Sequence, residues 1–337
     1  MHYVGEDGHK DICVFTVENA SGKVIETFET PATSEGMDIL IEKMGGKKFK
    51  ILAESSTYTI NLHEYLSSKG VESYLAHPTK LKLITESNKK TDRNDSKTLA
   101  DYLRLWDKGE LDLSISYIVK DKERDLREMC RLREDMAQMK GQTMQKIKSH
   151  MRVNSQYCVF TDLSTKKARE WIRTNLSTDL TLMMLLDLYA HYETVADSID
   201  REIRKDYADK EDVKLLQSIP GIGLTTAAEL SSMIVNVKRF PTADKMRSYF
   251  GMCPKVKNSG QSVKHGHITK CGDPMMRQVL GRTIASHIKN APGDSIARYK
   301  ASHKGHGRSG TLNVACMNKL LDLVYAILTR GTPYVSR

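Results

Sequence analysis

The stretch Ile12-Cys-Val-Phe-Thr-Val-Glu-Asn-Ala-Ser-Gly-Lys-Val-Ile-Glu-Thr-Phe28 decides the fold of the N-terminal part of this chain. The run from Ile12 to Val17 is rich in β-branched and aromatic residues and predicts a buried strand. Asn19-Ala-Ser-Gly22 predicts a turn, and the alternation from Val24 to Phe28 predicts a returning strand. We therefore expect a β-hairpin near the start of the fold.

Strands and helices alternate after this hairpin. Thr33 and Ser34 predict the start of a helix that runs to about Met44 and ends at Gly45-Gly46. Further strands are expected over 49–53 and 71–76, and further helices over about 59–68 and 93–107. An initial hairpin followed by strand–helix alternation predicts a mixed sheet covered by helices.

The pattern changes to long amphipathic helices from about residue 121. One apolar seam has spacings of three and four and consists of Leu126, Met129, Leu132, Met136, Met139, Thr143 and Ile147. A second seam, over about 179–206, consists of Met184, Leu188, His191, Val195, Ile199 and Ile203. Two long helices joined by a polar connection favour an antiparallel coiled-coil hairpin, with an ordinary helical core as the alternative.

The last part of the chain, from about residue 211, predicts a mainly helical domain. Helices are expected over about 224–235, from Thr242 to about Phe250, and over about 274–290 and 311–329. Between them, 251–273 is rich in Gly, Lys and His and predicts an irregular stretch.

The net charge of +10 is unevenly distributed along the 337 residues. Residues 1–110 hold 15 Lys and Arg against 18 Asp and Glu, whereas residues 251–337 hold 14 against 3. The basic C-terminal part is therefore a candidate surface for polyanions, with a solubilising face as the alternative.

The spacing of the cysteines and the absence of long apolar runs argue against several classes of protein. The six cysteines form no C-x-x-C pair, so neither a zinc motif nor a disulfide framework is indicated. The N-terminus has no apolar leader, and no apolar run approaches the ~18 residues of a membrane span. We expect a cytoplasmic protein with no membrane partner.

Four carboxylates in the acidic N-terminal part could hold a metal ion. Asp7 is expected just before a strand, Glu54 ends a strand, and Asp92 and Asp95 lie three residues apart at a helix N-terminus. Carboxylates at strand ends and on a nearby helix can converge on Mg²⁺, which prefers oxygen ligands. Alternatively, Asp92 caps the helix and Glu54 is a solvated strand end.

Two features of the basic part suggest contacts with phosphate. Ile219-Pro-Gly-Ile-Gly223 resembles the hairpin of a helix-hairpin-helix element, in which backbone N–H groups approach a phosphate. The alternative is a plain helix–helix turn. Ser259, before Gly260, could be a nucleophile on an exposed turn with cations nearby, or an ordinary loop serine. The candidate nucleic-acid-binding residues are Gly221, Gly223, Lys255, Lys257, Lys264, His265, His267, Lys270 and Arg277.

Several short blocks follow one another along the chain in a specific order. They are Gly5-Glu-Asp-Gly-His-Lys10, Glu54-Ser-Ser-Thr-Tyr58, Lys90-Thr-Asp-Arg-Asn-Asp-Ser96, Ile219–Gly223, Arg239-Phe-Pro241, Gly251-Met-Cys-Pro254, Ser259-Gly260 and Lys270-Cys-Gly272. In this order they resemble the DEDD-type insertion-sequence transposases, also called the insertion-sequence one-ten family or bridge-RNA-guided recombinases. The resemblance spans nearly the whole chain, and its C-terminal blocks are the more specific.

Two departures from the family pattern bear on the expected site. Glu6 and Gly8 stand where the family has apolar residues beside Asp7, which predicts a weak or shifted first strand. Ser56-Thr57 replaces Thr-Gly, which leaves the turn after Glu54 open to a different form.

The resemblance implies a fold that combines an α/β part with an α part. Residues 1–118 would form a RuvC-like, RNase-H-type mixed sheet with helices, in which Asp7, Glu54, Asp92 and Asp95 are the acidic tetrad. Residues 119–210 would form a coiled-coil segment used in assembly. Residues 211–337 would form a helical transposase domain that carries a helix-hairpin-helix-like element and the catalytic Ser259.

The resemblance also implies an activity and its partners. Ser259 would attack DNA and form a phosphoserine link, while the carboxylates and Mg²⁺ of a partner subunit, with Mn²⁺ as the alternative ion, complete the site. The implied partners are target and donor DNA, a structured noncoding bridge RNA, and further copies of the chain in a dimer or tetramer.

Two other functions stay open on the sequence. A RuvC-like endonuclease would hydrolyse DNA with metal-activated water and no covalent intermediate, and Ser259 would then be a loop residue. A non-catalytic nucleic-acid-binding scaffold fits the basic C-terminal part but leaves the acidic tetrad unexplained.

Overall fold

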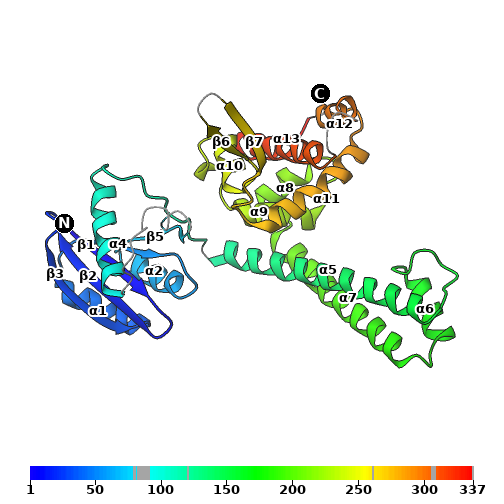
Figure 1. Cartoon of the computed structure of the whole chain (residues 1–337), viewed down its shortest axis with the longest axis horizontal. Helices are drawn as coiled ribbons and strands as arrows, with labels where there is room; N and C mark the ends of the chain where they lie inside the picture. Colours follow the sequence, from blue (N-terminus) through cyan, green and yellow to red (C-terminus); the bar gives the residue numbers. More distant parts are fainter. Residues whose placement is uncertain (79–80, 82–91, 120, 260–261, 305–308, 336–337) are drawn as a thin grey trace. The chain divides into compact units, whose positions relative to one another are not determined.

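The structure is a computed structural model that describes residues 1–78, 81, 92–119, 121–259, 262–304 and 309–335. The chain divides into two compact units, unit 1 (Met1–Ile118) and unit 2 (Val119–Arg337), shown in Figure 1. This division coincides with the boundary predicted after residue 118. The two predicted C-terminal domains, 119–210 and 211–337, lie together in unit 2.

Unit 1 is built around a five-stranded sheet with the strand order β3-β2-β1-β4-β5. The pairs β1–β2 and β2–β3 are antiparallel, whereas β1–β4 and β4–β5 are parallel. The predicted mixed sheet is confirmed, and its arrangement is consistent with an RNase-H-like domain. The strands are β1 (His2–Gly8), β2 (Ile12–Asn19), β3 (Val24–Pro31), β4 (Phe49–Glu54) and β5 (Glu72–Ala76).

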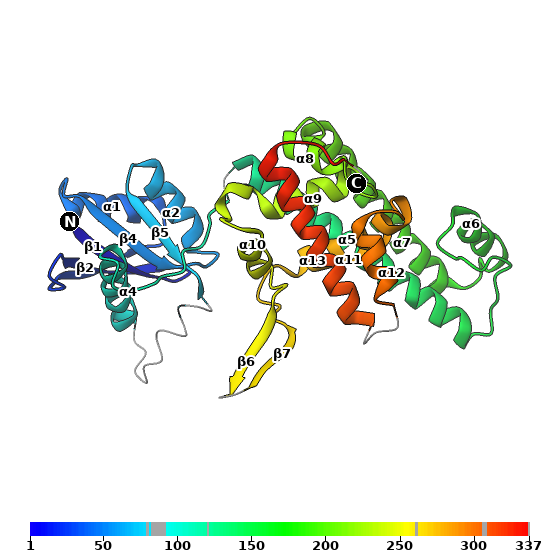
Figure 2. The same ribbon diagram turned by 90° about the horizontal axis from the view of Figure 1, so that it is seen from above.

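Helices cover both faces of this sheet, as Figure 2 shows. On one face, Val4 and Ile51 pack in a core with α1 and α2, and on the other, Tyr3 and Leu52 pack in a core with α4. Gly5 allows α4 to come close, because a β-carbon there would lie 1.9 Å from the Ser96 carbonyl oxygen. The helices are α1 (Ser34–Met44), α2 (Thr59–Ser68) and α4 (Asp92–Asp107).

The ends of α1 follow the sequence signals. The Thr33 side chain accepts a hydrogen bond from the Gly36 backbone N–H, and Gly45 closes the helix in the left-handed conformation with φ of 55°. The predicted cap and stop are both confirmed.

Two expectations about the first strand are wrong. Asp7 does not lie outside the strands but within β1, a strand that the sequence pattern did not predict and that pairs residue by residue with β2 from His2 to Gly8. Glu6 and Gly8 do not weaken or shift this strand. Each has a specific neighbour on α2, which is described with the candidate site below.

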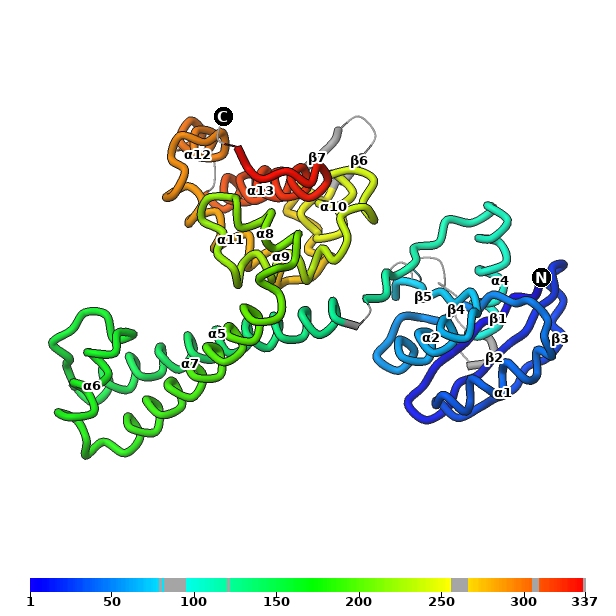
Figure 3. The backbone as a smooth tube through the Cα atoms, turned by 180° about the vertical axis from the view of Figure 1, so that it is seen from behind, coloured from blue at the N-terminus to red at the C-terminus, as the bar shows by residue number. Residues whose placement is uncertain are grey.

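Two long helices, α5 (Asp121–Val153) and α7 (Leu180–Tyr207), form the extended part of unit 2. They lie side by side and run in opposite directions (Figures 1 and 3), with the shorter α6 (Lys166–Asn175) at their far end. Both long helices match the predicted ranges closely. At the α6 end the three helices share a core that includes Ile147, Ile172 and Leu186.

The predicted apolar seams are partly wrong. Leu132 and Met139 of α5 are exposed, as are Met184 and Leu188 of α7. The reason is that α5 serves two different cores along its length. Its first half places Leu126 and Cys130 in the core of the C-terminal helices, and its second half packs against α6 and α7. No single helical stripe can therefore stay buried along all of α5.

The remaining helices of unit 2 pack around one apolar core. Three short helices, α6, α8 and α12, were missed because one to three turns give little periodic signal. The helices of this part are α8 (Glu211–Gln217), α9 (Leu224–Ile234), α10 (Ala243–Tyr249), α11 (Pro274–Asn290), α12 (Ser295–Ser302) and α13 (Ser309–Arg330), with a 3-10 turn at Val237–Arg239.

Helix α13 is, within the described ranges, the one helix with the length and mean hydropathy of a membrane span. Its residues Leu320, Leu321 and Val324 are buried in the core of unit 2. Its apolar character is therefore accounted for by packing within this unit.

The prediction of an irregular stretch over 251–273 is wrong. Most of it forms an antiparallel hairpin of β6 (Pro254–Ser259) and β7 (Ser262–Ile268). This two-stranded sheet is rich in Lys, His and Gly, so it lacks the apolar alternation by which strands are usually recognised.

We predict that unit 1 loses stability as the pH rises through 7, because of Glu18 on β2. Burial, with the nearby Asp101 carboxylate, raises the pKa of Glu18 to about 7, although Arg104 opposes this shift. An acid whose pKa is raised by folding favours the folded state below its unfolded pKa, and this contribution is lost as the pH passes the folded pKa. The loss should be roughly 2–3 kcal/mol between pH 4.5 and 8.

Hydrogen exchange of β2 and α4 in the full chain measures this effect. Glu18→Gln should remove the pH dependence and raise the stability of these elements at pH 8. An unchanged pH dependence in Glu18→Gln would contradict the assignment.

Candidate functional site

Asp7 and Glu54 lie at the ends of two neighbouring parallel strands. The parallel register pairs Glu6 with Ala53, so Asp7 and Glu54 are the next residues along β1 and β4. Side chains alternate between the faces of a sheet, and Tyr3 and Leu52 belong to the core on the α4 side. Asp7 and Glu54 therefore share that side of the sheet.

Asp95 lies in the first turn of α4, the helix that packs on β1. The backbone of its neighbour Ser96 approaches Gly5, two residues before Asp7. The fold thus brings three of the four predicted carboxylates to one region of unit 1. The fourth, Asp92, begins α4, and its side chain lies outside the described residues.

The Asp7 carboxylate is partly exposed to solvent and lies beside a histidine. Its carboxylate lies 3.2 Å from the His9 imidazole, and its side chain is 22% exposed. Glu54 is exposed and Asp95 is half-buried. Solvent and ions can therefore reach these groups.

The donor chemistry of this region fits a divalent cation, because carboxylate oxygens are the ligands that Mg²⁺ prefers. In the part of the chain that the structure describes, no three His, Cys, Asp or Glu side chains are grouped closely enough to hold a metal ion. Asp7, Glu54 and Asp95, together with Asp92, would hold such an ion, and their convergence stays a prediction.

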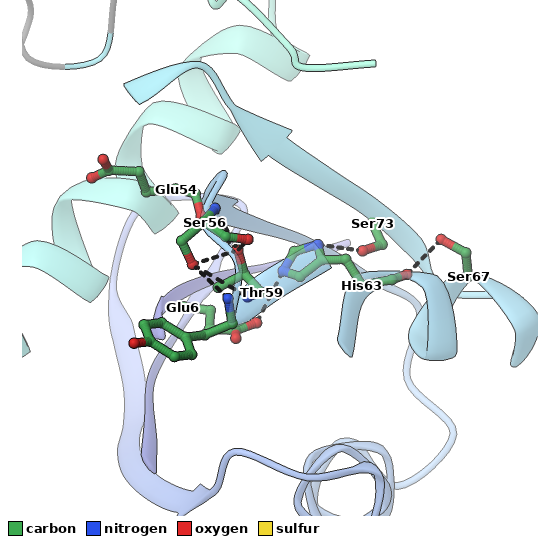
Figure 4. A network of polar contacts seen from close by, with 8 residues as sticks. Glu6, Glu54, Ser56, Thr59, His63, Ser67 and Ser73 are labelled. Atoms are coloured by element: carbon green, nitrogen blue, oxygen red, sulfur yellow. Dashed lines mark hydrogen bonds and ion pairs between the residues drawn. The ribbon is translucent and has the colours of Figure 1, made fainter. Parts of the chain in front are cut away.

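A buried polar network is built around His63 and Glu6, the residue that precedes Asp7 in β1 (Figure 4). Glu6 Oε2 lies 3.0 Å from His63 Nε2 on α2, and both side chains are fully buried. His63 Nδ1 lies 2.5 Å from Ser73 Oγ on β5. Burial, with the adjacent Glu6 carboxylate, raises the pKa of the Cys13 thiol well above its usual range. His63 is thus the partner that allows a buried carboxylate at a position where the resemblance predicts an apolar residue.

The turn after Glu54 is ordered by hydroxyl groups. Thr59 Oγ1 donates to the Glu54 carbonyl oxygen at 2.8 Å and accepts from the Ser56 backbone N–H at 3.0 Å. Thr59 also limits residue 8 to glycine, because a β-carbon there would lie 2.5 Å from Thr59 Cγ2. In Figure 4 the Glu54 carboxylate points away from this network. Helix α2 thereby contacts the ends of both β1 and β4.

Ser259 ends β6 and pairs with Ser262 across the hairpin. Lys255, His267 and Lys270 are exposed on this hairpin and its base. The side chains of Ser259, Lys257, Lys264 and His265, and the whole of Gly260, lie outside the described residues. The phosphate contacts predicted for this hairpin therefore stay predictions.

Gly221 has a packing role that the sequence reading left open. It has φ of 85°, and a β-carbon there would lie 2.6 Å from the His287 backbone nitrogen on α11. A plain helix–helix turn packed on α11 therefore accounts for Gly221. Gly223 is the N-cap residue of α9, and a β-carbon built there would have no atom within 4 Å. This open space leaves the Gly223 backbone accessible to a phosphate.

Sequence reasoning missed several arginines that bind backbone carbonyls. Arg127 Nε donates to the Ser232 carbonyl oxygen at 3.0 Å, and Arg239 Nε donates to that of Ile234 at 3.1 Å. These bonds satisfy carbonyl groups at the C-terminus of α9. The one signal for Arg239 is its place in the Arg239-Phe-Pro241 block, which supports the family resemblance but does not indicate a backbone contact.

A buried acidic residue, Glu229 on α9, was also missed. It is bonded to Arg282 of α11, and Arg282 in turn contacts Glu134 of α5 at 2.5 Å. Burial raises the pKa of Glu229, and Arg282 opposes this shift. These residues tie three helices of unit 2 together.

Two family models match this chain. Residues 4–154 match a transposase model of the DEDD IS110 type, and residues 213–300 match the model described as Transposase IS116/IS110/IS902 family. The first covers unit 1 and helix α5, and the second covers most of the C-terminal helices of unit 2 together with the β6–β7 hairpin.

Curated relatives agree with these matches. The transposase for insertion sequence element IS1111A of Coxiella burnetii is 22% identical over 344 residues, which cover 98% of this chain and 90% of that protein. The transposase for IS1328 of Yersinia enterocolitica is 25% identical over 156 residues, 45% of this chain and 47% of that protein. A pilin gene-inverting protein of Moraxella lacunata is 29% identical over 125 residues, 36% of this chain and 38% of that protein. The last two matches thus span less than half of the relative.

We predict that His63→Leu destabilises unit 1 by about 3–5 kcal/mol, because it leaves the Glu6 carboxylate buried without its partner. The double variant Glu6→Ile/His63→Leu should recover most of this loss, since both polar groups are then removed. Urea unfolding followed through Trp106 fluorescence in a Trp171→Phe background reports on unit 1.

His150→Leu is the matched control, followed through Trp171 fluorescence in a Trp106→Phe background, since it breaks a part-exposed His–Asp pair with Nε2 and Oδ2 2.8 Å apart in unit 2. It should cost less than about 1 kcal/mol. If His63→Leu cost no more than His150→Leu, the buried pair would not be needed for the β1 strand.

Proposed function

Because this chain belongs to the IS110 family of insertion-sequence transposases, we propose that it cuts and rejoins DNA through a phosphoserine at Ser259, guided by a structured noncoding RNA. Its activity as a DNA transposase follows from the family. The phosphoserine, the guide RNA and the metal ion are the proposed parts.

The observation that carries this proposal is the placement of Asp7 and Glu54. They lie next to each other at the ends of parallel strands, on the side of the sheet where α4 begins. Partly exposed carboxylates in this arrangement suit metal-assisted phosphoryl transfer. The DEDD-type model that matches residues 4–154 supports the same use of these residues.

The proposed chemistry exchanges one phosphodiester bond for another. When bound at the carboxylates, a divalent ion would polarise the phosphate and stabilise the leaving oxygen. Ser259 Oγ forms a bond to phosphorus, and the bond from phosphorus to the DNA 3′ oxygen breaks. The serine hydroxyl loses one proton and the leaving 3′ oxygen gains one, so the step is balanced. Rejoining is the reverse attack by a 3′ hydroxyl, so no external energy source is needed.

Relatives favour rejoining over simple hydrolysis. The Moraxella protein is named as a pilin gene-inverting protein, and inversion of a DNA segment requires that cut ends be joined again. A hydrolytic endonuclease, which we keep as the second candidate, would leave them cut. A non-catalytic scaffold does not fit a transposase family.

The basic part of unit 2 would bind the nucleic-acid backbones. Residues 251–337 carry a net charge of +11, and Lys255, His267 and Lys270 are exposed on the hairpin that carries Ser259. Such contacts are mainly to phosphates and give affinity without sequence readout. A guide RNA would then supply the sequence specificity for target and donor DNA by base pairing, as in other RNA-guided proteins.

The extended helices of unit 2 would serve assembly. Val153, Tyr157, Leu180 and Met184 are all more than half exposed near the end of the α5–α7 pair that carries α6. Several exposed apolar side chains near one end of a helix pair are typical of protein contacts. We propose that further copies of the chain cover them in a dimer or tetramer with coiled-coil contacts.

We predict that Ser259→Ala abolishes the covalent protein–DNA adduct and lowers recombination by on the order of 10³-fold or more, because the attacking oxygen is lost. Denaturing gels of reactions on a plasmid that carries the element's ends and flanking noncoding DNA detect the adduct. Ser262→Ala, across the hairpin, is the control and should retain it. Recombination near the wild-type rate in Ser259→Ala would refute the nucleophile assignment.

We predict that Asp7→Asn lowers strand cleavage by on the order of 10²–10³-fold, because it removes a proposed metal ligand from unit 1. DNA binding should stay within about twofold of the wild type, because the basic side chains of unit 2 are unchanged. Chelation of divalent ions should have the same effect on the wild type, and added Mg²⁺ or Mn²⁺ should reverse it. Asp11→Asn, an exposed carboxylate in the β1–β2 turn, is the control. Cleavage that persists in chelator would exclude the metal role.

A further inference from the structure

The base of the β6–β7 hairpin is a close crossing of two backbone segments. Gly251 has φ of 67°, and a β-carbon there would lie 2.5 Å from the Cys271 backbone nitrogen. A β-carbon at Gly272 would lie 2.4 Å from the Tyr249 carbonyl oxygen. Both glycines are therefore required for the two segments to come this close.

Arg277, in the first turns of α11, joins the two segments at this crossing. Its guanidinium donates to the Gly272 carbonyl oxygen at 2.8 Å and to the Phe250 carbonyl oxygen at 3.3 Å. A weaker third contact reaches the Asp273 carbonyl oxygen at 3.4 Å. One side chain thus bonds the segment before β6 and the segment after β7.

The same base is anchored to the core of unit 2. Phe250 and Met252 are almost completely buried, and Asn318 of α13 donates to the Met252 carbonyl oxygen at 3.3 Å. Backbone bonds close the base from Thr269 N to Cys253 O at 2.9 Å and from Lys270 N to Gly251 O at 3.0 Å. The hairpin therefore leaves the helical core from a joint with little freedom to rotate.

We infer that Arg277 is a positioning residue, which fixes the base of the β6–β7 hairpin and so sets where Ser259 is presented to DNA. This inference rests on the proposed function of Ser259. It differs from the phosphate contact that the sequence predicted for Arg277, since the guanidinium is engaged with backbone carbonyls and the side chain is only half-exposed.

An arginine suits this role better than a lysine. All three bonds come from one nitrogen, Nη1, and the planar guanidinium holds this nitrogen in a fixed direction, so its N–H groups can bond carbonyls on two segments at once. A lysine carries the same charge on a flexible stem with a single ammonium group. Arg277→Lys therefore separates the geometric role from the contribution of the charge.

The test compares Arg277→Lys, Arg277→Gln and the wild type in the full chain with three measurements. Hydrogen exchange over β6 and β7 reports on the order of the hairpin, and exchange in α13 reports whether unit 2 is folded. Affinity for a labelled nonspecific duplex, across a range of salt, reports phosphate contacts. Single-turnover adduct formation, with saturating DNA and guide RNA, reports the chemical step.

We expect Arg277→Lys to increase hairpin exchange by about tenfold or more and to slow adduct formation by on the order of 10–100-fold, as misplacement of a reacting group does. Exchange in α13, duplex affinity and the salt slope should stay as in the wild type. Arg298→Gln, an exposed arginine on α12, is the control and should leave hairpin exchange and adduct formation unchanged.

Two results would overturn the inference. One is wild-type exchange and adduct formation in Arg277→Lys. The other is a salt slope reduced by about one in Arg277→Gln with hairpin exchange unchanged, which is the signature of a lost phosphate contact. A third result separates the two claims. If hairpin exchange increased in Arg277→Lys while Ser259→Ala recombined fully, Arg277 would still fix the base of the hairpin, but Ser259 would not be the nucleophile.

Discussion

The parallel pairing of β1 with β4 is the constraint on which the candidate metal site depends. It places Asp7 beside Glu54, although they are far apart in the sequence, and it places both on the α4 side. Gly5 lets α4 pack against the same strand, so the first turn of α4 brings Asp95 to this region. A shift of one residue in this register would turn Glu54 to the opposite face of the sheet.

Helix α2 supports this pairing from the other face. Glu6 bonds His63 and Thr59 bonds the Glu54 backbone, so one helix contacts the ends of both strands. The buried pair is an unusual solution, because a carboxylate stands where apolar packing would serve. It is tolerated since its partner comes from a helix that the fold already places there.

Much of this architecture could be predicted because local signals and tertiary structure agree. The hairpin at Ile12, the Thr33 cap and both long helices are examples. The failures have physical causes. The β6–β7 hairpin lacks an apolar face, the seam of α5 changes where that helix passes from one core to another, and the His63 partner of Glu6 depends on a tertiary contact. The phosphate contacts predicted for Gly221 and Arg277 stay predictions, while the packing of Gly221 and the backbone bonds of Arg277 depend on the tertiary position of α11, which no local pattern shows.

The central claim is that a serine on the hairpin becomes bonded to DNA. The most direct measurement is mass spectrometry of the tryptic peptide containing residue 259, after a stalled reaction and digestion of the DNA with nuclease. We expect a nucleotide attached through phosphate to Ser259, in a reaction that requires a divalent ion. Cut DNA with free 5′ phosphates and an unmodified peptide, or a nucleotide on another residue, would contradict it.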